Sequence, residues 1–189
     1  AGLAGVIDEA TKALAGYDHA RALEVVETFF WTFCDDYLEL VKERAYTGGG
    51  QEQASAVAAL RIALSALQRL LAPYLVFAAE ESWSWWQSGS VHSTPWPTAN
   101  DLPALGAEVR PELLAEVGLA LTGIRGAKTE AKLSQRTPVE SLTISAPAAL
   151  IEALQSAEGD LKAVGRIATI EWAVASDDAA LTVSNVTFV

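Results

Sequence analysis

The sequence predicts a mainly α-helical protein, in which an antiparallel helical bundle is followed by a long helix and a small α/β module. Apolar residues recur at helical spacing through most of residues 3–86, whereas β-prone segments appear only after residue 138. Of the 189 residues, 51% are hydrophobic, so the chain can bury a core and is not globally disordered. We expect the bundle over residues 1–104, the connecting helix over 105–137 and the module over 138–189.

Four helices make up the predicted bundle. They cover residues 3–14, 19–46, 52–71 and 74–86. Gly16 ends the first helix, and Asp18 is placed to cap the second. Three glycines at 48–50 end the second helix, and Pro73 breaks the third. The stretch 88–106, which is rich in Ser, Gly and Pro, predicts an irregular loop.

The remaining chain predicts one long helix and then a β-α-β-β unit. Pro111 suits the first turn of the helix, which we expect over residues 110–133. The alternation of apolar and polar residues predicts the strands, and an alanine-rich run predicts the helix between them. The predicted strands cover residues 139–144, 167–174 and 181–189, with a short helix over 147–155 and a further turn at 160–164.

Composition excludes several classes of protein. The formal charge of −11, from 13 Lys and Arg against 24 Asp and Glu, argues against bulk attraction to DNA or RNA. No apolar run reaches the ~20 residues of a membrane span, and the missing signal peptide predicts a cytoplasmic location. There is no methionine, so we expect a processed protein or a piece of a longer one.

No group of residues predicts catalysis or a metal centre. A single cysteine, Cys34, excludes an internal disulfide and a cysteine-based zinc site. His19 precedes it by 15 residues on one predicted helix, too far for a base to activate the thiol. Asp35, Asp36 and Glu39 could hold a divalent ion, but no second acidic run faces them. A buried structural thiol and a solvated acidic face are therefore expected.

The tryptophans allow two interpretations. Trp83, Trp85, Trp86 and Trp96 could stack on bases or sugars, or they could pack in the bundle. Helical spacing places Trp83 and Trp86 on one face and Trp85 elsewhere. Packing is the simpler interpretation.

The most informative polar pattern is a basic stripe formed by Arg125, Lys128, Lys132 and Arg136. If the long helix continues through Arg136, these side chains fall within an arc of about 80° on one helix face. Such a stripe can contact successive phosphates of a nucleic acid. It can equally be a solvated face, or pair with the acidic bundle.

Two segments are more distinctive than a generic helix. The first is FFWTFCDDYLELVKERAY at residues 29–46. The second joins LLAPYL at 70–75, EESWSWW at 80–86, GSVH at 89–92 and PWP at 95–97. Together they closely resemble the anticodon-binding region of bacterial valyl-tRNA synthetases. Order and spacing match as well as residue type, and the resemblance continues weakly through the C-terminal module.

The resemblance implies the anticodon-binding bundle of a class I synthetase, with a valine-accepting tRNA and the catalytic domain of the parent chain as partners. The ATP-binding signatures of that class, His-x-Gly-His and Lys-Met-Ser-Lys-Ser, are absent from the sequence. The chain is therefore not expected to be an enzyme by itself or to bind a cofactor. Its parent would be a valine–tRNA ligase that uses ATP and Mg²⁺, and the first helix of the family's bundle would precede Ala1.

The resemblance also gives the basic residues a role. Tyr37, Lys42 and Arg44 belong to the most distinctive motif and would face the anticodon stem-loop, by stacking and by phosphate pairing. Arg125, Lys128, Lys132 and Arg136 would follow the stem backbone. The tRNA-binding candidates are thus Tyr37, Lys42, Arg44, Arg125, Lys128, Lys132 and Arg136, whereas Trp83, Trp86, His92 and Trp96 would be structural.

Two rival interpretations stay open. One is a stand-alone relative that binds RNA without aminoacylation. The other is an acidic helical module that binds a protein partner, which predicts a contact insensitive to salt and no affinity for tRNA. An independent enzyme is the weakest rival, because no pair of nucleophile and base was found.

Overall fold

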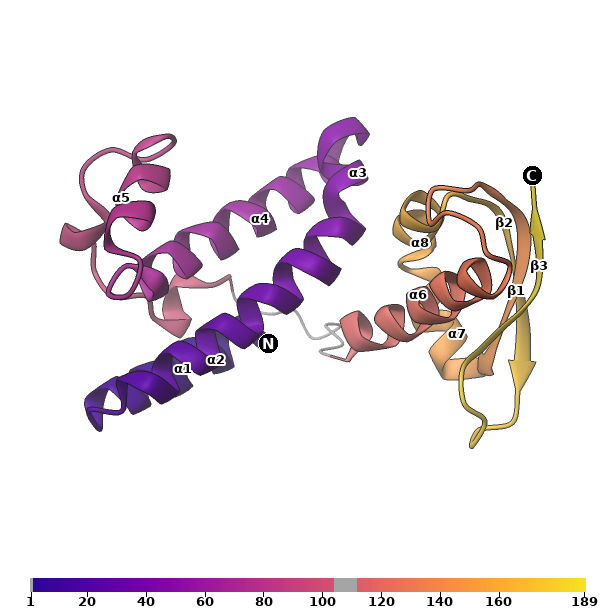
Figure 1. Ribbon diagram of the computed structural model, residues 1–189, viewed down its shortest axis with the longest axis horizontal. Coiled ribbons are helices and arrows are strands. Elements are labelled where there is room, and N and C mark those ends of the chain that lie inside the picture. Colours follow the sequence, from indigo (N-terminus) through magenta and orange to yellow (C-terminus); the bar gives the residue numbers. More distant parts are fainter. Residues whose placement is uncertain (1, 104–111) are drawn as a thin grey trace. The chain divides into compact units, whose positions relative to one another are not determined.

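The computed structural model describes residues 2–103 and 112–189, which fold into two compact units (Figure 1). The N-terminal unit comprises residues 1–38 and 49–109, and the C-terminal unit comprises 39–48 and 110–189. The predicted fold class, mainly helical with a small α/β module, is confirmed. This division differs from the predicted boundaries at 104 and 137, because residues 39–48 group with the C-terminal unit and residues 110–137 are not a separate segment.

The N-terminal unit consists of helices joined by short turns. Its elements are α1 (Gly2–Ala15), α2 (His19–Thr32), the π-helical segment η1 (Phe33–Leu38), α4 (Gly50–Leu71), α5 (Val76–Ser84) and the 3-10 turns η2 (Val91–Ser93) and η3 (Ala99–Asp101). Figure 1 shows α1 and α2 side by side, as an antiparallel pair. The predicted helices are confirmed with two differences. The helix expected over residues 19–46 is divided into α2, η1 and α3 (Glu39–Thr47), and α3 belongs to the C-terminal unit. Helix α5 begins at Val76, because the N–H groups of Tyr74 and Leu75 turn back to the carbonyl of Leu71.

The turn between α1 and α2 shows why both helices end where they do. Tyr17 adopts a left-handed conformation with φ of 61°, and the N–H of Asp18 then reaches the carbonyl of Ala13 at 2.9 Å. The Asp18 carboxylate accepts the backbone N–H of Arg21 at 3.0 Å. The predicted cap is therefore confirmed.

The core of this unit lies among α1, α2 and α4. Its buried residues are Ile7, Ala10, Val26, Ala66, Leu67 and Leu70, and Phe29, Phe30 and Phe33 cover them. Trp96 closes one end, because its indole N–H donates to the hydroxyl of Thr11 at 2.9 Å. The loop after η2 is thereby fixed to α1.

Helix α4 is long and apolar enough, by length and composition alone, to cross a membrane; it is the one such helix among the described residues. A third of its most apolar window is buried, and Ala66, Leu67 and Leu70 pack into the bundle core. Core helices of globular proteins pass the same test, so this helix is weak evidence for a membrane span.

The tryptophans serve packing in most positions. Trp83 is 5% exposed and packs edge-to-face on Trp86, with ring centroids 5.8 Å apart. The indole N–H of Trp86 donates to Oε1 of the buried Gln68 at 3.0 Å. Trp85 is 74% exposed, so the prediction that it points away from the other two is confirmed.

The C-terminal unit places helices against a small mixed sheet. Its elements are α3 (Glu39–Thr47), α6 (Leu113–Glu130), β1 (Val139–Pro147), α7 (Ala148–Gln155), α8 (Glu158–Gly165), β2 (Ile167–Ala175) and β3 (Thr182–Phe188). The strand order is β2-β1-β3, with β2 parallel and β3 antiparallel to β1. In Figure 1, α6, α7 and α8 lie on one side of this sheet. The predicted β-α-β-β order is confirmed, except that the turn expected at 160–164 is the helix α8.

Helix α6 is part of this unit, because it packs on β3, α7 and α8. A Cβ added to Gly123 would lie 2.6 Å from Cγ2 of Val183, so the helix approaches β3 more closely than any larger residue would allow. The inward residues Leu142, Ile144 and Ala146 of β1 are fully buried beneath the helices. This packing fixes the position of the side chains that α6 carries.

Candidate nucleic-acid interface

The predicted basic stripe does not exist as one helix face, because α6 ends at Glu130. Lys132 adopts a left-handed conformation with φ of 57°. Its N–H reaches the carbonyl of Thr129 at 2.9 Å, and the N–H of Leu133 reaches that of Lys128 at 2.9 Å. These two bonds form a Schellman motif, which ends a helix. The expectation of a helix through residues 133 and 136 is therefore wrong, and its predicted start at residues 110–111 lies outside the described residues.

Lys128 is buried rather than solvent-facing, with 1% of its surface exposed. Its ammonium donates to the carbonyl oxygens of Gly165 at 2.8 Å and of Gln135 at 3.1 Å. Burial lowers the pKa of this ammonium, and the charge of Arg166 lowers it further. The prediction that Lys128 forms part of an exposed stripe is wrong, because its charge caps the end of α8 and the loop after α6.

The loop after α6 folds back over the helix. The side-chain amide of Gln135 donates to the carbonyl of Arg125 and to the hydroxyl of Thr129, both at 3.2 Å. Arg136 follows Gln135, so it is returned to the same region as Arg125 although no helix joins them. The loop thus restores a proximity that the predicted helix would have provided.

A cavity of about 310 Å³ lies where α3, α6, this loop and the end of α8 meet. We call it the cation pocket. Its walls are Glu39, Lys42, Leu121, Ile124, Arg125, Lys128, Gln135, Arg136, Val164, Gly165 and Arg166. Five cationic side chains face one carboxylate, a formal charge of +4 in a chain of −11. The structure therefore brings together four of the predicted residues, namely Lys42, Arg125, Lys128 and Arg136.

Arg166 is the residue of this pocket that no sequence pattern revealed. It ends α8 in a left-handed conformation with φ of 53°, and its guanidinium donates to the carbonyl of Arg136 at 3.3 Å. The preceding Gly165 allows close packing, since a Cβ there would lie 2.5 Å from Cδ1 of Ile167. A glycine after an apolar helix face is the one hint that the sequence offers for this helix end.

The two basic residues of α3 form ion pairs. Lys42 pairs with Glu39 one turn earlier, so its charge in the pocket is partly offset. Arg44 pairs with Asp160 of α8 at 3.0 Å, with side chains 33% and 16% exposed. Arg44 therefore fixes α3 against α8 rather than presenting a free guanidinium.

Tyr37 belongs to the N-terminal unit. It lies in the π-helical segment, where its ring stacks on Phe33 with centroids 5.5 Å apart. Phe33 stacks in turn on Phe29 at 6.3 Å. Nearby, burial and the charge of Asp35 raise the pKa of the half-buried Cys34 thiol, which suits a structural cysteine better than a nucleophile.

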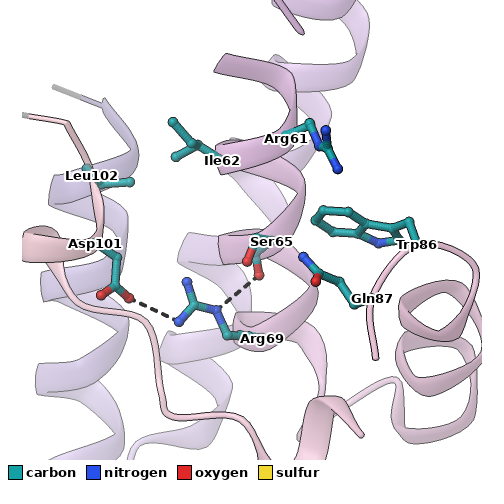
Figure 2. Close-up of a pocket in the computed structure, with 8 residues that line it drawn as sticks. All are labelled: Arg61, Ile62, Ser65, Arg69, Trp86, Gln87, Asp101 and Leu102. Carbon is teal, nitrogen blue, oxygen red and sulfur yellow. Dashed lines mark hydrogen bonds and ion pairs between the residues drawn. The ribbon is translucent and has the colours of Figure 1, made fainter. Parts of the chain in front are cut away.

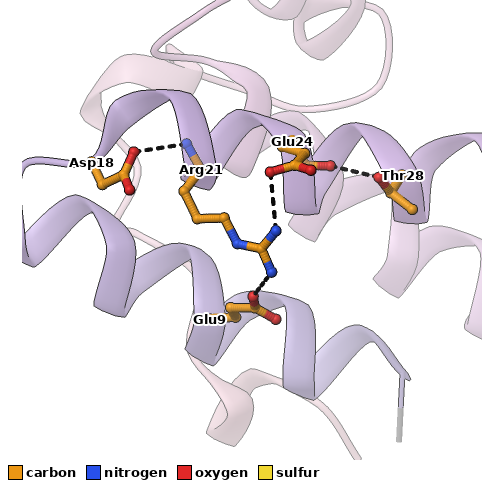
Figure 3. A network of polar contacts seen from close by, with 5 residues as sticks. All are labelled: Glu9, Asp18, Arg21, Glu24 and Thr28. Carbon is orange, nitrogen blue, oxygen red and sulfur yellow. Dashed lines mark hydrogen bonds and ion pairs between the residues drawn. The ribbon is translucent and has the colours of Figure 1, made fainter.

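Two arginines of the N-terminal unit, Arg21 and Arg69, are neutralised by carboxylates. Arg69 pairs with Asp101 at 3.0 Å (Figure 2). The backbone N–H of Thr98, and after it the guanidinium of Arg69, lower the pKa of Asp101. Arg21 bridges Glu9 of α1 and Glu24 of its own helix (Figure 3). These arginines therefore hold the bundle together.

A second cavity, of about 240 Å³, lies beside Arg69 in the same unit. Figure 2 shows Arg61, Trp86 and Gln87 around it. Asp101 offsets one of its two arginines, so it lacks the charge excess of the cation pocket. Across residues 2–103 and 112–189, no three His, Cys, Asp or Glu side chains are placed to hold a metal ion.

Comparison with known proteins connects this geometry to a family. Residues 1–144 match the family described as the anticodon-binding domain of tRNA ligase. A valine–tRNA ligase of Leifsonia xyli subsp. xyli is 58% identical over 93% of this chain, and one of Thermobifida fusca is 50% identical over 96%. One of Cutibacterium acnes is 47% identical over 94%. The chain spans about a fifth of the length of these curated relatives, since 20% of each is covered.

Proposed function

Because the chain belongs to the family of tRNA-ligase anticodon-binding domains, we propose that it docks the anticodon arm of a valine-accepting tRNA for a valine–tRNA ligase. In this proposal the chain positions the tRNA and does no covalent chemistry. The ATP and Mg²⁺ of aminoacylation would act in a catalytic domain elsewhere in the parent enzyme, and the work would take place in the cytoplasm.

The observation that carries the proposal is the convergence of cations in an acidic chain. Arg125 and Arg136 come from different segments and reach one pocket with Arg166. RNA stems are recognised largely through their phosphates and shape. A local positive region is therefore the feature that this function requires, and overall charge does not supply it.

The predicted residues divide into two roles in this proposal. Arg125, Lys132 and Arg136 are exposed and would contact phosphates, and Lys42 would contribute when its pair with Glu39 opens. Lys128 and Arg44 would act as positioning residues, because their charges already hold the unit together. Tyr37 would stack on an unpaired loop base, as aromatic side chains do in single-stranded RNA recognition.

The test is binding of the chain to a valine-accepting tRNA and to an unrelated tRNA across a salt series. We expect a preference for the valine tRNA and an affinity that falls steeply with salt. Arg125→Gln and Arg136→Gln should each flatten the dependence of log K on log salt by about 0.7–0.9, the effect of one lost phosphate contact.

Arg61→Gln is the matched control, since it also removes one exposed arginine but lies outside the cation pocket. It should leave the salt slope unchanged. Equal slopes for all three variants, or equal affinity for both tRNAs, would contradict the proposed docking.

A further inference from the structure

We propose that the cation pocket is a binding site for one phosphate group, which we call the seat. The guanidinium groups of Arg125, Arg136 and Arg166 would hold the phosphate above the buried ammonium of Lys128. That the phosphate belongs to the backbone of a docked RNA rests on the proposed function, but the existence of the seat does not. No pattern in the sequence assigns Arg166 a role. The structure makes it the central residue of this site.

Unpaired charge is the first argument for the seat. Among the described residues, no carboxylate forms an ion pair with Arg125, Arg136 or Arg166. Glu39, the one carboxylate of the pocket, pairs with Lys42. These three arginines thus lack the counter-ion that Arg21 and Arg69 of the N-terminal unit receive from their own chain.

Burial is the second argument. The Lys128 ammonium is removed from water, and it donates to two neutral carbonyls. A buried charge without a partner of opposite sign is unfavourable, and the lowered pKa of Lys128 reflects that cost. An anion in the pocket would stabilise the charged lysine.

The shape and composition of the pocket suit a phosphate group. Leu121 and Ile124 are buried in its wall, which lowers the local dielectric and strengthens each charge interaction. Guanidinium groups present paired N–H donors that match the oxygens of phosphate. A volume of about 310 Å³ is ample for a tetrahedral oxyanion that enters with part of its ester.

A purely structural explanation accounts for only part of the site. Capping the end of α8 explains Lys128, and closing the loop on α8 explains one donor of Arg166. Neither explains why Arg125 and Arg136 also line the same cavity without carboxylates. Three guanidinium groups around one ammonium repel each other, and an anion removes that repulsion.

The experiment uses the whole chain labelled with ¹⁵N and inorganic phosphate as the probe. We expect saturable shifts in the backbone amides of residues 164–167 at constant ionic strength. Arg166→Asn removes the guanidinium and keeps a residue that tolerates the left-handed conformation. It should weaken phosphate binding about tenfold, the loss expected for a charge-assisted hydrogen bond.

Arg125→Gln should weaken phosphate similarly, whereas Arg61→Gln should match the unmodified chain. Unchanged amide spectra of the unliganded variants, apart from the substituted site, will show that the unit is still folded. The absence of saturable shifts at residues 164–167, or equal affinity in all variants, would overturn the seat.

A second arm replaces inorganic phosphate by an RNA hairpin with the anticodon arm of a valine-accepting tRNA. Displacement of bound phosphate by the hairpin would identify the backbone as the source. Phosphate binding without hairpin binding would keep the seat, assign it to a free phosphate ester and reject the proposed docking. Hairpin binding that Arg166→Asn leaves unchanged would reject the RNA backbone as the source of the phosphate and keep the docking.

Discussion

Substitution of Gly123 tests the contact that positions α6, and with it Arg125 and Lys128. A Cβ at this position would lie 2.6 Å from Cγ2 and 3.1 Å from Cβ of Val183. Both atoms belong to a β-branched side chain next to the β3 backbone, so neither moves freely. Gly123→Ala therefore forces a shift of α6 or of the strand, and overpacking of this kind costs about 1–3 kcal/mol.

The same helix supplies the control. Gly118 lies on α6 with nothing within 4 Å of an added Cβ, so Gly118→Ala should stabilise the unit by about 0.5–1 kcal/mol. This helix-propensity gain is common to both variants and cancels in their difference. The difference in free energy of unfolding should therefore equal the overpacking cost of about 1–3 kcal/mol.

The assay must follow the C-terminal unit alone. Trp172 is the one tryptophan in the sequence of that unit, since the other five lie at positions 31, 83, 85, 86 and 96. A chain labelled with 5-fluorotryptophan therefore reports its unfolding in urea through one ¹⁹F resonance. If Gly123→Ala unfolds at the same urea concentration as Gly118→Ala, α6 does not sit on β3 as closely as described, and the reasoning fails.

Three further substitutions test other features. Lys128→Met should abolish a rise of the free energy of unfolding with pH. The pKa of Lys128 in the folded chain lies below its ordinary value of 10.5. Between the folded and the ordinary pKa the unfolded state binds more protons, so raising the pH favours folding. Urea midpoints of both chains at increasing pH measure this difference. Lys132→Val should destabilise the unit by about 1–2 kcal/mol, because a β-branched residue resists the left-handed conformation, whereas Lys132→Gly should not; the Trp172 resonance measures both. Gln68→Leu should cost the N-terminal unit about 1–3 kcal/mol, because it leaves the half-buried Trp86 indole N–H without its acceptor and removes the amide that donates to the Ser82 hydroxyl; urea unfolding followed by the Trp86 resonance checks it.

The helices were predictable because their apolar periodicity is long and their ends carry recognisable residues. Asp18 caps α2, and the glycines at 48–50 separate α3 from α4. Helix α8 was mistaken for a turn because its eight residues include Gly159 and Gly165, which lower helix propensity. Its packing on α3 and β2 supplies the stability that its composition does not.

The candidate site was predictable in its members but not in its geometry. Helical periodicity placed Arg125 and Arg136 together only if the helix was continuous between them. In the structure a Schellman motif, with Lys132 in place of the usual glycine, ends the helix before Arg136. Lysine is rarely buried, so no local pattern could show that Lys128 points into the unit. Arg166 reaches the pocket through the crossover between parallel strands, a tertiary contact that sequence spacing does not encode.

The net charge of the chain is negative and that of the cation pocket is positive, which affects the salt dependence expected for the proposed RNA binding. The acidic surface repels a polyanion, but only within a Debye length of about 8 Å at physiological ionic strength. Added salt weakens the pocket contacts and relieves this repulsion at the same time. The absolute slope of log K against log salt should therefore understate the number of phosphates contacted.

The difference in slope between the unmodified chain and Arg125→Gln or Arg166→Asn is the more direct measure of the phosphates contacted, because the repulsion is nearly the same in both.

The balance between an acidic surface and a cationic pocket also favours discrimination between RNAs. A uniformly basic surface accepts any RNA that comes near, whereas an acidic chain with one cationic pocket gains only when a phosphate reaches that pocket. In the proposed docking, an RNA that cannot place a phosphate there would meet net repulsion, so the charge of the whole chain would contribute to selectivity without contacting the ligand.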